Sequence, residues 1–114
     1  MKTLLALAAT SVVVMAVPAQ ARTYSDIVQC VKVVDGRCNK WDRLTDEQAA
    51  KAQWKMGYVF GPSYSYTALD TIPHDYVTEY SLDPGARYVY QNGYIYVVDP
   101  KSYAVTKIIY TAPR

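Results

Sequence analysis

Two β-rich runs near the C-terminus, residues 87–91 and 94–98, form the clearest hydrophobic pattern in the chain. Only Asn92 and Gly93 separate them, and an Asn-Gly pair favours a two-residue hairpin turn because both residues tolerate positive φ. A third β-rich run at 104–109 follows a second turn. The pattern predicts a three-stranded antiparallel meander whose register is fixed by the Asn-Gly turn.

The predicted turn also decides which side chains face each other across the hairpin. The expected pairs are Tyr88 with Val97, Tyr90 with Ile95, Val89 with Tyr96, and Gln91 with Tyr94. Both faces of the hairpin therefore carry large side chains. We expect one face to pack on a helix and the other, rich in tyrosine, to be partly exposed to water.

A helix is predicted over residues 46–56. Thr45 and Gln48 have the spacing of a capping box, in which each side chain bonds the backbone N–H of the other residue. An alanine-rich sequence follows, and Gly57 provides a stop. An isolated helix of this length is only marginally stable, so we expect it to dock on the sheet.

The rest of the chain shows weaker patterns. Pro73 indicates a second, two-turn helix over residues 73–80, because proline suits the first turn of a helix. The β-branched run at 27–34 predicts a strand that ends at a turn formed by Asp35-Gly36. Residues 57–70 are expected to be extended, either as a strand or as an ordered loop. Together these elements predict a small α+β domain.

The first 21 residues have the pattern of an export signal. Lys2 precedes an apolar run of about 14 residues, shorter than the ~20 that a membrane span needs, and Ala19-Gln20-Ala21 fits a signal peptidase site. We therefore expect cleavage after Ala21 and a periplasmic or secreted protein without a membrane span. The remaining residues, 22–114, suffice for one domain with a cysteine-bearing segment (22–45), the helix (46–56) and a C-terminal module (72–109).

The charge and the tyrosine content limit the classes of partner that we expect. The chain has 12 Lys and Arg against 10 Asp and Glu, and this net charge of +2 is not the basic footprint of a nucleic-acid-binding protein. It has 12 tyrosines but one Phe and two Trp. This surplus fits either a thin domain whose sheet is half exposed, or a surface that binds sugars or a protein. The candidate binding residues are Tyr88, Tyr90, Tyr94, Tyr96 and Tyr103.

Cys30 and Cys38 are the only cysteines. In an oxidising compartment we expect a structural disulfide between them, worth about 2.5 kcal/mol by chain entropy. An intermolecular bond and free or metal-bound thiols are the alternatives. A tight two-residue turn at Asp35-Gly36 would place Cys30 opposite Trp41 rather than Cys38. The bond therefore predicts a wider or irregular connection between the two cysteine segments.

No constellation of residues indicates catalysis. His74 is the single histidine, so only one imidazole base is available, and no Gly-x-Ser-x-Gly nucleophile elbow occurs. Asp70, Asp75 and Glu79 flank His74, but a soft divalent metal prefers more nitrogen or sulfur ligands than this. We expect a non-enzymatic protein without a cofactor, in which His74 is a weak candidate metal ligand.

Several short segments in residues 72–109 form a familiar combination: Ile72-Pro73, Tyr80-Ser81-Leu82-Asp83-Pro84, Arg87-Tyr88-Val89-Tyr90, Gly93-Tyr94-Ile95-Tyr96-Val97-Val98-Asp99-Pro100 and the run at 105–109. In this order they resemble the C-terminal module of small exported proteobacterial proteins, which include the RcnB-type nickel/cobalt homeostasis proteins and related families of unknown function. The resemblance implies an exported, non-enzymatic α+β module with a link to metal homeostasis. The matching positions are apolar or turn residues, so it supplies no metal ligands.

The function expected from these observations is that of a small periplasmic structural or interaction module. It would present its Tyr-rich sheet face to a periplasmic protein or a cell-wall component, and an exposed strand edge would offer a further contact. The alternative, from the resemblance, is a periplasmic accessory in nickel/cobalt homeostasis.

Overall fold

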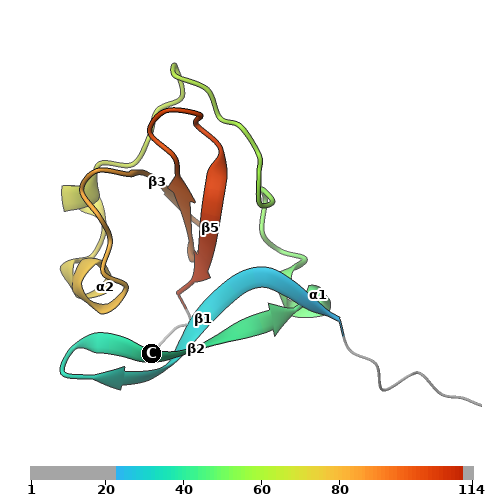
Figure 1. Cartoon of the computed structure of the whole chain (residues 1–114), viewed down its shortest axis with the longest axis vertical. Helices are drawn as coiled ribbons and strands as arrows, with labels where there is room; N and C mark the ends of the chain where they lie inside the picture. Colours follow the sequence, from blue (N-terminus) through green and yellow to red (C-terminus); the bar gives the residue numbers. More distant parts are fainter. Residues whose placement is uncertain (1–22, 112–114) are drawn as a thin grey trace, which may run out of the picture.

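The strands form one five-stranded mixed sheet in the order β2-β1-β5-β4-β3 (Figure 1). The structure, a computed structural model, describes residues 23–111, and the expected signal peptide with its cleavage site after Ala21 lies outside the described residues. The strands are β1 (Tyr24–Val34), β2 (Arg37–Thr45), β3 (Arg87–Gln91), β4 (Tyr94–Val98) and β5 (Val105–Tyr110). The helical segments are short: α1 (Asp46–Ala49), η2 (Leu69–Thr71) and α2 (His74–Glu79).

The β3–β4 hairpin has the register that the Asn-Gly turn predicts. Asn92 (φ 53°) and Gly93 (φ 82°) form the turn, and all four expected cross-strand pairs are present. β5 pairs antiparallel with β4 and places Ile108 opposite Tyr96. Thr111 secures the end of β5, because its N–H and its hydroxyl both donate to the Gly93 carbonyl, at 2.8 and 2.7 Å.

The predicted meander accounts for only three of the five strands in the sheet. β5 also pairs in parallel with β1, with Val28 opposite Ile109. The strand predicted at 27–34 is longer, and it continues into β2, which the sequence did not predict because most of its residues are polar. The protein is therefore a small single domain that is mostly β, which corrects the α+β prediction.

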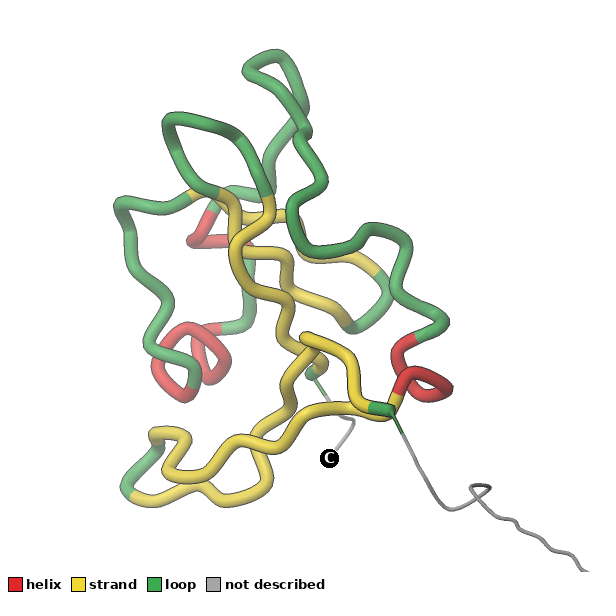
Figure 2. Tube along the Cα trace, turned by 45° about the vertical axis from the view of Figure 1, so that its right-hand side comes forward, coloured by secondary structure: helices red, strands yellow, loops and turns green. Residues whose placement is uncertain are grey.

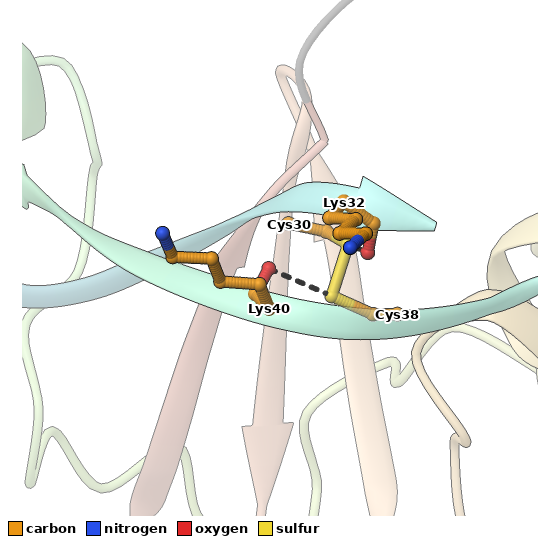
Figure 3. The surroundings of a disulfide bond; sticks show 4 residues. All are labelled: Cys30, Lys32, Cys38 and Lys40. Atoms are coloured by element: carbon orange, nitrogen blue, oxygen red, sulfur yellow. Dashed lines mark hydrogen bonds between the residues drawn. A yellow bond between two sulfur atoms is a disulfide. The ribbon is translucent and has the colours of Figure 1, made fainter. Parts of the chain in front are cut away.

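A tight two-residue turn at Asp35 (φ 53°) and Gly36 (φ 79°) joins β1 to β2, and Cys30 lies opposite Trp41 as that turn requires. The Cys30–Cys38 disulfide forms all the same, with Cα atoms 5.8 Å apart (Figure 3). The strand register shifts on both sides of Lys32. Such bulges bend and twist a strand locally, and they allow the disulfide. Of the two expected alternatives, the wider loop is therefore wrong, and the irregular connection is confirmed by these register shifts.

α1 is much shorter than predicted, since it spans Asp46–Ala49 rather than 46–56. The capping box of Thr45 and Gln48 is present as predicted. The chain then leaves the helix, because the Gln53 N–H donates to the Tyr96 hydroxyl at 3.0 Å and the Trp54 ring packs edge-on against Tyr96, with centroids 5.2 Å apart. These tertiary contacts outweigh the helix propensity of the residues after Ala49.

Both faces of the C-terminal part of the sheet are covered. One face, with Val89 and Tyr96 at its centre, is covered by side chains from residues 49–66. The other face, with Ile95 at its centre, packs against residues 69–82, which include α2. Figures 1 and 2 show α2 and the loop after α1 on opposite sides of these strands. The prediction that one face stays partly exposed is therefore corrected.

The two remaining segments agree more closely with the sequence analysis. α2 spans His74–Glu79, within the predicted 73–80, and Pro73 stands at its N-terminal cap. Residues 57–68 form an ordered loop rather than a strand. This loop meets the sheet through two isolated bridges, Val59–Ala104 and Thr67–Tyr88.

Candidate functional site

Three of the five tyrosines expected to form a binding surface lie in the core. Tyr88, Tyr94 and Tyr96 are only 2%, 4% and 1% exposed. The Tyr88 hydroxyl donates to the Asp83 carbonyl at 2.6 Å, and burial raises the pKa of all three phenols. The other two, Tyr90 and Tyr103, are half-buried. The three buried sheet tyrosines therefore hold the fold together and are not open to a partner.

A second group of rings, which includes Tyr103 from the expected set, lies mainly on the loop that follows α1; among them Tyr58 is exposed and the others are half-buried. We call it the aromatic strip, and its members are Trp54, Tyr58, Phe60, Tyr64, Tyr66 and Tyr103. Neighbouring rings touch along the strip. The centroids are 4.8 Å apart for Trp54 and Phe60, 4.6 Å for Phe60 and Tyr64, and 5.5 Å for Tyr64 and Tyr66. These pairs are tilted or edge-on, the arrangement that aromatic rings prefer.

Backbone hydrogen bonds fix the strip to the start of β5. The Gly57 N–H donates to the Val105 carbonyl, and the Val105 N–H donates to the Tyr58 carbonyl, both at 2.8 Å. The Phe60 N–H donates to the Tyr103 carbonyl at 2.9 Å. Gly57 has a φ of 85°, a left-handed conformation that glycine adopts without steric cost. The rings are thus carried by a backbone that is itself bonded to the sheet.

Arg87 extends the strip at the end formed by Tyr66 and Tyr103. These two rings are stacked, with centroids 6.3 Å apart. The guanidinium carbon of Arg87 lies 5.4 Å from the Tyr66 centroid and 5.6 Å from the Tyr103 centroid, within cation–π range. Burial raises the pKa of Tyr66, and the Arg87 charge opposes that rise. Because Arg87 is exposed, this end of the strip presents a positive charge to solvent.

The other end of the strip is apolar and open to solvent. Met56, Tyr58 and Val59 are 38%, 46% and 56% exposed. Several exposed apolar side chains within a short segment of chain are typical of interaction surfaces. The sequence analysis missed the strip because it assigned Trp54 to the predicted helix at 46–56 and found no sustained periodicity in the residues after Gly57. The aromatic density of this segment was the signal that could have revealed it.

A hollow of about 620 Å³ lies between α1 and the Asn92 turn. Its lining residues are Gln29, Leu44, Glu47, Gln48, Lys51, Asn92, Tyr94 and Tyr110. Glu47 is the single carboxylate among them, and they include no Ser, Cys or His. The hollow therefore does not pair a nucleophile of these types with a base, the arrangement that covalent catalysis needs.

His74 is exposed at the start of α2 and lines a shallow hollow together with Asp70. Of its other acidic neighbours in sequence, Asp75 is exposed and Glu79 is buried. Within residues 23–111, no three His, Cys, Asp or Glu side chains are grouped so that they could hold a metal ion. The weak candidacy of His74 as a ligand stays a prediction.

Two further findings bear on the compartment and on relatives. None of the helices between residues 23 and 111 is long and apolar enough to span a bilayer. The Cys30–Cys38 disulfide is compatible with export to an oxidising compartment. No protein-family model, curated protein or solved structure matches the chain.

Proposed function

We propose that this protein is a small, exported, non-enzymatic interaction module that binds a periplasmic protein through the aromatic strip. The observation that carries the proposal is the open end of the strip, where Met56, Tyr58 and Val59 are exposed and the Tyr58 ring packs on Phe60, with centroids 4.9 Å apart. Trp, Tyr, Phe, Met and Arg are the residue types enriched in protein interfaces, and all five occur in or beside the strip. The proposed binding surface is therefore on the loop after α1, whereas the sequence analysis expected it on the sheet face.

The strip suits binding because it is already ordered before a partner arrives. Its rings pack on one another, and its backbone is bonded to β5. Ordering flexible side chains and loops at an interface opposes association, so a preformed surface binds more tightly. Tyr58 is the strongest candidate for a dominant contact, because it combines an exposed ring with a hydroxyl group.

Replacing Tyr58 and Val59 with serine tests the proposal. The exported protein is used as bait in a periplasmic extract, and captured proteins are identified by mass spectrometry. We expect a specific partner to be retained by the wild type and recovered at least about tenfold less by Tyr58→Ser/Val59→Ser, because a dominant interfacial aromatic contributes about 2 kcal/mol or more.

Val33→Ser/Val34→Ser is the matched control, since Val33 and Val34 are 43% and 44% exposed but lie near the end of β1, away from the strip. The control should retain the partner as the wild type does. Equal recovery by all three proteins would contradict the proposal. Co-sedimentation with purified peptidoglycan that the double substitution abolishes would assign the strip to a cell-wall glycan instead, because tyrosine rings also stack on sugars.

Export and the lack of catalysis belong to the same proposal. N-terminal sequencing of the protein recovered from the periplasm should begin at Arg22. The nickel/cobalt alternative predicts heat on calorimetric titration with Ni²⁺ or Co²⁺ that His74→Ala removes. We expect no such heat from the wild type, and heat that depends on His74 would favour the alternative.

A further inference from the structure

The tip of the β1–β2 hairpin, residues 31–40, projects from the sheet on the side away from the aromatic strip. β1 pairs with β5 only at Val28 and Gln29, so beyond those residues the two hairpin strands bond only to each other. Figures 1 and 2 show the hairpin and the loop at residues 60–66 at opposite ends of the molecule. The hairpin tip is therefore a separate surface from the one that carries the proposed function.

The hairpin tip exposes apolar side chains that the fold does not bury. Val31, Val33 and Val34 are 45%, 43% and 44% exposed. None of the three belongs to either core cluster or packs against one. Three exposed valines within four positions give the tip an apolar surface that needs an explanation other than folding.

Cations surround these valines. Lys32 and Lys40 are paired across the hairpin by their Cα positions, and their ammonium groups point apart (Figure 3). Arg37 stands next to the turn. Among residues 23–111, no carboxylate lies within ion-pair distance of any of these three side chains. Asp35 is the single acidic residue of the tip, so the tip has an excess of positive charge.

The tip is also held rigid. The Cys30–Cys38 disulfide crosses its base (Figure 3). Each sulfur lies 3.2 Å from the carbonyl oxygen two residues ahead, Lys32 for Cys30 and Lys40 for Cys38; a disulfide sulfur carries no proton, so these are close packing contacts. At the base, Trp41 packs on Tyr80 with centroids 5.6 Å apart, and the Lys107 ammonium lies 4.5 Å from the Trp41 ring centroid. The valines and lysines are thus presented together in a fixed arrangement.

We infer that the hairpin tip docks on a lipid bilayer with anionic headgroups. The valines enter the boundary between headgroups and acyl chains, and Lys32, Arg37 and Lys40 meet the lipid phosphates. Apolar insertion and cationic attraction act together in peripheral membrane binding. The phosphates thereby neutralise two lysines whose backbones are paired across the hairpin.

Co-sedimentation with unilamellar vesicles tests this inference. The exported protein is mixed with vesicles of equimolar phosphatidylglycerol and phosphatidylethanolamine, or of phosphatidylcholine alone. We expect binding to the anionic vesicles that weakens as salt rises, and little binding to phosphatidylcholine. Lys32→Gln/Lys40→Gln should bind at least about tenfold more weakly, and Val33→Ser/Val34→Ser should also bind more weakly.

The matched control is Lys51→Gln/Lys101→Gln, which removes the same charge from exposed positions outside the hairpin. It should bind nearly as well as the wild type. All variants share the wild-type N-terminus, so a difference between them isolates the tip. Thermal unfolding checks folding, and removing the lysine pair should leave the melting temperature nearly unchanged. Absence of binding, equal losses in tip and control variants, or equal binding to both vesicle types would overturn the inference.

Discussion

Tyr96→Phe is the substitution that best isolates how the core and the loop depend on each other. Tyr96 is 1% exposed, and its hydroxyl accepts the Gln53 N–H at 3.0 Å at the point where the chain leaves α1. Phenylalanine keeps the ring that supports Trp54 but removes the acceptor. The Gln53 N–H then loses its partner in a partly buried position, which costs about 1–2 kcal/mol.

For a domain of this size, that loss of unfolding free energy corresponds to a fall of about 5–10 °C in melting temperature. Urea denaturation and thermal unfolding of the exported wild type and variant measure it. Tyr58→Phe is the control, because Tyr58 is 46% exposed and should change stability by no more than about 0.5 kcal/mol. If Tyr96→Phe were as stable as the wild type, the hydrogen bond that ends α1 would not explain the path of the loop.

Three other predictions concern the disulfide and the ionisable groups. Cys30→Ala/Cys38→Ala should lower the free energy of unfolding by up to about 2.5 kcal/mol in urea denaturation, and unchanged stability would mean that the bond does not brace the fold. Burial raises the pKa of the three core tyrosines, so the folded state keeps protons that the unfolded chain releases. Stability should be full below about pH 10 and fall as the pH rises further, and a melting temperature that stays constant through this range would contradict their burial. The Ser102 and Lys101 N–H groups donate to the Asp99 carboxylate at 2.9 and 2.7 Å and lower its pKa. Asp99→Asn should therefore remove part of the stability that the wild type loses as the pH falls below about 4, and identical acid melting profiles would be the contrary result.

The features that the sequence analysis predicted correctly are local ones. The Asn92-Gly93 turn fixes the β3–β4 register because its φ angles are accessible to few residues. The capping box at Thr45 needs only residues three positions apart. α2 begins after Pro73 for a similarly local reason. In each case the determining residues are close together in the chain, so the local sequence pattern is enough to predict the structure.

The features that it missed depend on contacts between distant residues. The helix at 46–56 ends early because Gln53 and Trp54 bond and pack on Tyr96, more than 40 positions away. The parallel pairing of β1 with β5 leaves no periodic signature, and the mostly polar composition of β2 hides it. The expected exposure of Tyr94 and Tyr96 on a sheet face was wrong for the same reason, since the loop that covers them has no regular pattern.

Mapping tyrosine nitration in the native protein by mass spectrometry tests the central claim most directly, namely that the sheet tyrosines form the core and the loop after α1 forms the surface. The exposed fractions are 46% for Tyr58 but 2%, 4% and 1% for Tyr88, Tyr94 and Tyr96. We predict rapid nitration of Tyr58, and protection of the other three until the protein is unfolded. Rapid nitration of Tyr94 and Tyr96 in the native state, with Tyr58 protected, would contradict the claim.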